Sequence, residues 1–69
     1  MKSQEIRQLP EAEIRTEIEK RRGDIFRLRL RAGSQDVENS GALRVLRREI
    51  ARMLTILRER EREGVEKHG

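Results

Sequence analysis

The sequence predicts an all-α fold: an antiparallel two-helix hairpin, preceded by a possible short N-terminal helical turn. Apolar residues recur at helical spacing in two separate stretches of the 69-residue chain. One short polar segment bounded by glycines joins the two stretches, which is typical of a turn. No stretch has the alternating pattern of a β-strand. We therefore expect a single domain over residues 1–69, with long helices at about 10–32 and 41–62.

The first long helix is predicted to begin at Pro10, because the first turn of a helix does not use the N–H that proline lacks. Glu11 and Glu13 follow, and acids in the first turn complement the helix dipole. Gly33 can cap the far end. Arg21 interrupts the apolar stripe, where its stem can cover apolar surface while its head reaches water or phosphate. The stripe itself consists of Ile14, Ile18, Ile25, Leu28 and Ala32.

The turn is predicted over residues 33–40, and Asn39 or Ser40 can supply the N-cap of the second long helix. That helix has the more regular apolar stripe, made of Leu43, Leu46, Ile50, Met53 and Leu57, with Leu54 broadening it. Residues 63–69 are expected to fray. So short a connector predicts antiparallel helices. Across their seam, one group is expected to face the other: Leu46, Ile50 and Leu57 against Ile14, Ile18, Ile25 and Leu28.

The small apolar content predicts that the protein depends on a partner. Hydrophobic residues make up 33% of the chain against 43% charged residues. A core of this size supplies only about 3–5 kcal/mol, and disulfides, metals or partners usually add the rest. With no Cys and one His, a partner is the expected remedy. Ile6 and Leu9 can form an extra turn, but Val45, Ile56, Phe26 and Leu30 are expected to lack complete cover.

Several function classes are not expected from these residues. The carboxylates near the end of the chain alternate with basic residues and would lack the burial that acid–base catalysis needs; they are Glu59, Glu61, Glu63 and Glu66. His68 is expected to be an ordinary tail residue, and no nucleotide-binding glycine loop or metal-spaced ligand set occurs. No apolar run approaches the roughly 20 residues of a membrane span, and the first residues lack a secretory signal. We therefore expect a cytoplasmic non-enzyme without cofactor, metal, small-molecule substrate or membrane partner.

The distribution of arginine points to nucleic acid. The net charge is +4, and fourteen of the seventeen basic residues are arginine, whose planar fork matches phosphate. Basic groups concentrate in residues 20–32 and 44–52. Arg44, Arg48, Arg52 and Thr55 share one predicted helix face with Arg47 beside them, and the first helix adds Lys20, Arg22, Arg27, Arg29 and Arg31. We expect the protein to contact the phosphate backbone and the overall shape of the nucleic acid and not to read its bases, since aromatic stacking platforms are absent.

Three other interpretations compete with nucleic-acid binding. The charges can form a solvated surface balanced by glutamates one helical turn away. The regular 3-4 spacing also suits a coiled-coil adaptor that binds a partner helix, although Arg21 and the glycine-bounded turn oppose it. A membrane-surface helix is disfavoured, because the basic residues do not lie opposite a face of bulky aromatic residues.

One long segment resembles a known family. LRREIARMLTILRERE (46–61), with Leu43, Arg44 and Val45 before it, resembles the C-terminal signature of the bacterial large-subunit ribosomal protein twenty-nine family. The opening residues, DIFRLRL (24–30) and residues 37–39 add weaker similarity. The resemblance implies a structural constituent of the large ribosomal subunit that binds its rRNA near the polypeptide exit. It also implies a neighbouring ribosomal protein there, and factors that receive nascent chains. By this resemblance, the best RNA-contact candidates are Arg47, Arg48, Arg52 and Thr55.

Overall fold

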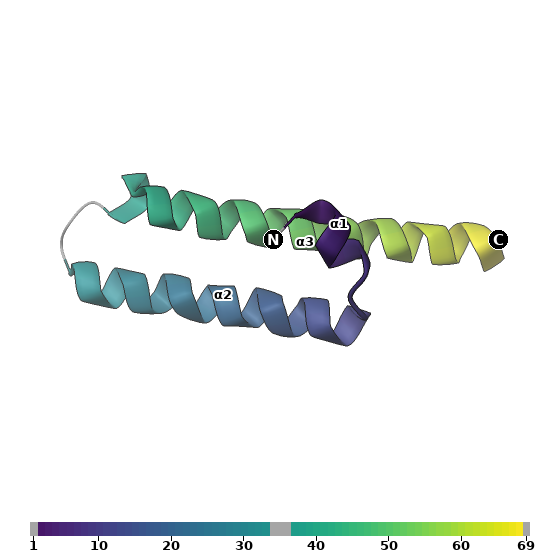
Figure 1. Cartoon of the computed structure of the whole chain (residues 1–69), viewed down its shortest axis with the longest axis horizontal. Helices are drawn as coiled ribbons and strands as arrows, with labels where there is room; N and C mark the ends of the chain where they lie inside the picture. Colours follow the sequence, from purple (N-terminus) through teal and green to yellow (C-terminus); the bar gives the residue numbers. More distant parts are fainter. Residues whose placement is uncertain (1, 34–36, 69) are drawn as a thin grey trace.

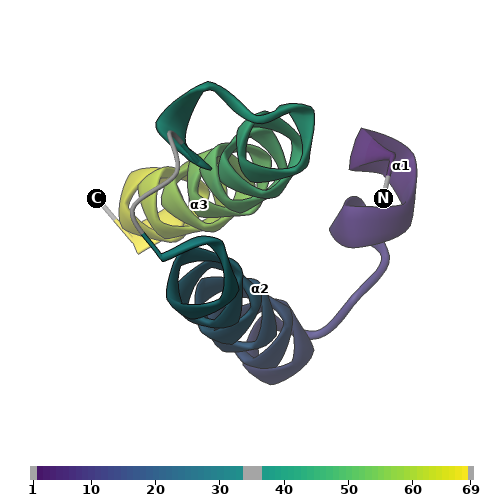
Figure 2. The same ribbon diagram turned by 90° about the vertical axis from the view of Figure 1, so that its left-hand side faces the viewer.

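A computed structural model describes the backbone of residues 2–33 and 37–68, and the side chains of these ranges as far as Glu63. In chain order it contains α1 (Ser3–Arg7), α2 (Glu11–Ala32), a 3-10 turn (Val37–Asn39) and α3 (Gly41–His68). Helices α2 and α3 lie side by side and antiparallel (Figure 1). Helix α1 lies to one side of this pair, which is clearest along the hairpin axis (Figure 2). The predicted α-hairpin with a short leading helical turn is confirmed.

Local signals explain where the long helices begin and where α2 ends. The Pro10 carbonyl accepts the N–H groups of Glu13 and Ile14 at 3.0 and 3.1 Å, so α2 starts directly after the proline. Gly33 follows the last residue of α2 with φ 62°, a conformation that strains residues with a Cβ. Of the two predicted N-cap candidates for α3, Ser40 is the cap, because its Oγ accepts the Leu43 N–H at 3.1 Å.

The end of α3 differs from the prediction. The sequence placed it near residue 62 with a frayed tail over 63–69, whereas the helix continues to His68. Residues 63–68 contain no proline, and the single glycine among them costs only about 1 kcal/mol in a helix. The other residues include two glutamates and a lysine, which favour helix. With 28 residues, α3 is longer than the 22-residue α2 and extends beyond it. The molecule is 50 Å long and only 19 by 18 Å across.

The core lies toward the end of the hairpin where α1 joins it. Its buried cluster is Ile6, Ile14, Ile18, Met53, Ile56 and Leu57, with Leu9 and Ile50 packed against it. The predicted facing of Ile14 and Ile18 against Leu57 is therefore confirmed. Leu43 is also buried, whereas Ile25, Leu28 and Leu46 are partly exposed. Leu54 does not broaden the seam, since it sits at the solvent-facing edge of α3 and is 40% exposed.

Helix α1 covers a residue that the sequence left uncovered. Ile56 was expected to lie outside the hairpin seam, but it is buried together with Ile6 of α1. Two polar contacts hold α1 on α3: Arg60 Nη2 donates to the Arg7 carbonyl at 2.9 Å, and Arg7 pairs with Glu59 at 3.1 Å. A cation at the last carbonyls of a helix is favourable. The five-residue α1 is thus a third element of the core.

The head of Arg21 is engaged inside the protein, which corrects the expectation that it reaches water or phosphate. Its Nε lies 3.0 Å from Glu49 Oε2 on α3, and its Nη1 lies 2.9 Å from Glu17 Oε1 on α2. The side chain is only 14% exposed. Burial opposes the charge, but the hydrogen bonds to Glu17 and Glu49 outweigh it and raise the pKa of Arg21. Burial alone would raise the pKa of Glu49, yet hydrogen bonding, including that from Arg21, lowers it.

The lowered pKa of Glu49 predicts a specific dependence of stability on pH. The ionised carboxylate favours the folded state above its unfolded pKa of about 4.3, and that contribution disappears as pH falls through the lower folded pKa. We expect Glu49→Gln to melt below the wild type at pH 7, and the difference to shrink below about pH 4. Circular dichroism melts of both proteins at several pH values measure this. A difference that stays constant across the pH range would contradict the prediction.

Candidate nucleic-acid interface

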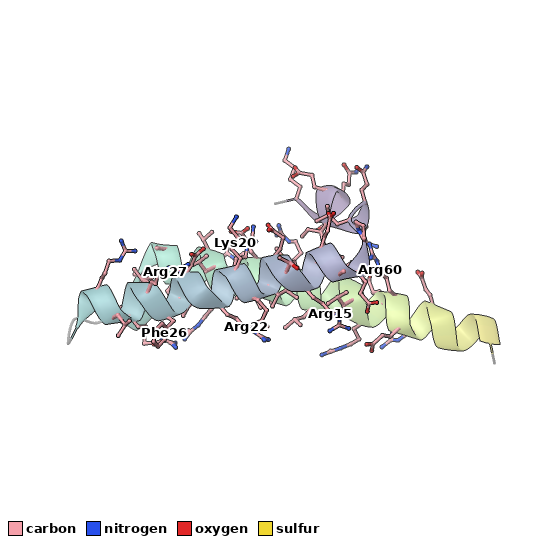
Figure 3. All side chains as sticks on the ribbon, turned by 90° about the horizontal axis from the view of Figure 1, so that it is seen from below. Arg15, Lys20, Arg22, Phe26, Arg27 and Arg60 are labelled. Atoms are coloured by element: carbon pink, nitrogen blue, oxygen red, sulfur yellow. The ribbon has the colours of Figure 1, made fainter. Side chains whose placement is uncertain are left out.

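The hairpin distributes the ten predicted RNA-binding residues over three surfaces. In Figure 3, Lys20 and Arg27 point to the side on which α1 lies, here called the α1 face, whereas Arg22 and Phe26 point to the opposite side. We call that opposite side the Phe26 face. The third surface is the back of α3, turned away from α2. The sequence predicted one basic surface on each long helix, whereas the structure divides the cations of α2 between the α1 face and the Phe26 face.

The back of α3 presents Arg44, Arg48 and Thr55, all exposed. Arg44 donates to the Asn39 carbonyl at 3.0 Å, and the Thr55 hydroxyl donates to the Ala51 carbonyl at 2.9 Å. Arg48 makes no hydrogen bond or ion pair with the part of the chain that the structure describes. Its guanidinium is therefore available to an external anion.

The small side chain of Ala51 lies exposed between Arg48 and Thr55 on this surface, which lets a ligand approach the helix closely. Arg52 was predicted on the same face, but it is only partly exposed and lies to one side of the row that Arg44, Arg48 and Thr55 form along α3. The row that faces solvent directly is therefore shorter than the sequence suggested. Of the predicted cations, it contains Arg44 and Arg48.

Glu38 links two predicted cations on the Phe26 face. Its two carboxylate oxygens lie 3.0 Å from Arg29 Nη2 of α2 and 2.5 Å from Arg47 Nη2 of α3. The hydrogen bond from Arg47 is the main reason that the pKa of Glu38 is lowered, with the charge of Arg29 adding to it. Sequence reasoning missed this role, although an acid placed between two basic blocks was the available signal. Glu38 therefore brings together arginines from both long helices.

The remaining cations of α2 are partly balanced by neighbouring acids. Arg22 pairs with Glu19 at 2.9 Å, and Arg27 pairs with Asp24 at 2.6 Å. These pairs are exposed, and such pairs contribute little to stability because water and salt screen them. Lys20 and Arg31 are exposed on α2 as well. The interpretation as a locally balanced, solvated surface thus describes Arg22 and Arg27 better than it describes Arg48.

On the α1 face, Arg27 and Arg31 border a groove between the long helices. Its floor includes Leu28, Val45 and Leu46. On the Phe26 face, Arg22, Arg29 and Arg47 line a shallow depression together with Ile25, Phe26 and Ile50. Across residues 2–33 and 37–68, no helix is long and apolar enough to cross a membrane. Among the side chains that the structure describes, those of residues 2–33 and 37–63, no group of acids or histidines could hold a metal ion.

A slim, arginine-rich α-hairpin with exposed cations on three surfaces is typical of small proteins that bind larger anionic partners. Comparison with known proteins identifies the class further. A family model described as "Ribosomal L29 protein" matches residues 4–60. The chain belongs to this ribosomal protein family. It is therefore a cytoplasmic, ribosome-bound protein and not an enzyme.

Curated relatives agree over most of the chain. "Large ribosomal subunit protein uL29" of Geobacillus stearothermophilus is 44% identical over 61 residues, covering 88% of this chain and 92% of the relative. The protein of the same name from Salinispora tropica is 43% identical over 61 residues, covering 88% of this chain and 78% of the relative. No solved structure gave a significant match. The resemblance stated from residues 46–61 is confirmed.

Proposed function

We propose that this protein is a structural constituent of the large ribosomal subunit and holds its rRNA through arginine–phosphate contacts near the nascent-chain exit. The names of the relatives support the subunit. The observation that carries the RNA contact is Arg48, an exposed guanidinium on the back of α3 beside Arg44. Arginine can bind two phosphate oxygens at once, and such contacts position a protein on RNA without reading its sequence.

The arrangement of the cations supports contact with folded rRNA from more than one direction. Arg48 extends from the back of α3, Lys20 and Arg31 from α2, and Arg29 and Arg47 from the turn end of the Phe26 face. A 50 Å rod of such small width can lie between RNA segments and touch several of them. A neighbouring ribosomal protein at the exit, and factors that receive nascent chains, complete the proposed setting. Those partners rest on the family resemblance.

The competing adaptor function is less well supported, because the hairpin already uses its apolar stripes. Ile14, Met53 and Leu57 are buried within the chain itself. A coiled-coil adaptor needs such a stripe free for a partner helix. Its affinity would follow substitutions of leucine and isoleucine and would respond weakly to salt.

Replacing Arg48 with glutamine tests the phosphate contact. A protein that neutralises phosphates releases condensed counterions, so its affinity falls linearly with salt on a log–log plot. We expect Arg48→Gln to reduce the magnitude of that slope for cognate large-subunit rRNA by about 0.7–0.9. Fold stability should hardly change, since the exposed Arg48 makes no contact that folding depends on. Filter binding or fluorescence anisotropy at several salt concentrations provides the slopes.

Arg15→Gln is the matched control, because it also replaces an exposed arginine with glutamine but lies on α2 outside the predicted contacts. Its slope should equal that of the wild type. A slope reduced equally by both variants would indicate a general charge effect instead of a contact at Arg48. Salt-insensitive binding by the wild type would overturn the phosphate mechanism.

A further inference from the structure

The only aromatic residue of the chain has no role in its core. Phe26 is 63% exposed on the Phe26 face, and Leu30, one helical turn further along α2, is 65% exposed. The exposure follows from helix geometry. The apolar neighbours Ile25 and Leu28 are partly buried, whereas Phe26 points away from α3. Truncation of Phe26 would therefore leave the fold intact, and its bulk is available to a partner.

Three arginines surround this ring. Arg22 precedes Phe26 by four residues and Arg29 follows it by three, so both are its neighbours on the surface of α2. Arg47 of α3 joins them, and the four residues line one depression together with Ile25 and Ile50. Figure 3 shows Arg22 and Phe26 on the side of the hairpin opposite α1. An exposed aromatic face with guanidinium groups on both sides suits a ligand that combines a flat ring with negative charge.

We propose that Phe26 stacks on an unpaired base of bound RNA while Arg22 and Arg29 hold the phosphates on either side of that nucleotide. This inference rests on the rRNA binding proposed above and adds the kind of nucleotide that the protein selects. The base must be unpaired, because bases inside a duplex are already stacked and present no free face. The sequence prediction that stacking platforms are absent rested on a single aromatic residue, yet one exposed ring is sufficient for one base.

The ion pairs of the free protein allow RNA phosphates to take the place of the carboxylates that now hold these arginines. Arg22 is held by Glu19 at 2.9 Å, and Arg29 and Arg47 are held by Glu38. All these pairs are about half exposed, so phosphate can replace the carboxylates at little cost. Glu38 acts as a positioning residue, since it draws Arg29 and Arg47 together beside the depression. A protein helix is a poorer occupant, because its apolar face would cover three arginine side chains without satisfying their charge.

Two substitutions of Phe26 separate stacking from simple apolar contact. Phe26→Leu keeps an apolar side chain but removes the aromatic face, whereas Phe26→Tyr keeps the face. For cognate large-subunit rRNA, we expect Phe26→Leu to weaken binding by roughly 5- to 150-fold, the range for loss of one stacked base. The log–log salt slope should stay unchanged, because no phosphate contact is lost. Phe26→Tyr should bind like the wild type.

Arg22→Gln and chemical probing complete the experiment. Arg22→Gln should reduce the magnitude of the salt slope by about 0.7. One unpaired nucleotide of the rRNA should change its probing reactivity when wild type binds and not when Phe26→Leu binds. Circular dichroism melts of all variants should match the wild type, as expected for exposed positions.

The outcomes distinguish this inference from the proposed function. If the wild type binds rRNA with a steep salt dependence and Phe26→Leu binds equally well, stacking is overturned while the phosphate mechanism stands. If the wild type fails to bind rRNA, the proposed function itself falls. If Phe26→Leu and Phe26→Tyr keep full rRNA affinity but lose a ribosomal protein neighbour, the ring belongs to a protein interface and the stacking proposal is wrong.

Discussion

Replacing Ile14 with alanine is expected to unfold the free hairpin. Ile14 is completely buried in the cluster shared by all three helices. Truncating a buried isoleucine costs about 2–5 kcal/mol, which is comparable to the roughly 3–5 kcal/mol that a core of this size supplies. Circular dichroism at 222 nm should therefore show a large loss of helix at 25 °C and no cooperative melting transition.

Two other apolar positions provide graded controls. Ile50→Ala should destabilise less, because Ile50 is only partly buried at the edge of the cluster. Leu54→Ala should change the melting curve little, since Leu54 is 40% exposed. An Ile14→Ala protein that melts like the wild type would show that the helices do not depend on this cluster.

Bound rRNA is expected to stabilise the protein strongly. A ligand that binds only the folded state adds about 4 kcal/mol when its free concentration is a thousand times its dissociation constant. The amides of α2 and α3 that exchange through global unfolding should then exchange about a thousandfold more slowly with cognate rRNA than without it. Hydrogen exchange followed by mass spectrometry measures this directly.

Two comparisons make the result specific. Small-subunit rRNA at the same concentration should protect the amides far less, and added salt should reverse the protection by cognate rRNA. Ile14→Ala should regain protected amides in α2 and α3 when cognate rRNA is present. A free chain whose amides already exchange as slowly as those of the complex would contradict the expectation that the isolated hairpin is only marginally stable.

Those features of the fold that depend on nearby residues could be predicted from the sequence. Pro10, Gly33 and Ser40 act on their own helix ends, and the stripes through Ile14 and Met53 follow from helical spacing. The burial of Ile56 could not be derived in this way. It depends on Ile6, fifty residues away, and on how the short link between α1 and α2 directs the first helix.

The candidate site shows the same division. Spacing identified Arg44 and Arg48 as neighbours on α3, and the structure places both in solvent. Spacing could not show that Arg21 is committed to Glu49, because that ion pair joins residues 28 positions apart. Nor could it show that Glu38 joins Arg29 to Arg47 or that the ring of Phe26 lies among three arginines, since both depend on how α2 and α3 face each other.

The largely buried ion pair between Arg21 and Glu49 also has a consequence for how the two long helices align. Apolar side chains tolerate sliding, because one isoleucine can replace another one turn along the stripe. A charge tolerates it poorly. If α3 shifted by one turn, Arg21 would face apolar neighbours instead of Glu49 and would pay the desolvation of an unpaired guanidinium. A single polar position inside an apolar seam sets register in coiled coils for this reason. Arg21 thus fixes the axial register of α2 against α3. It thereby also fixes where the arginines of one helix lie relative to those of the other.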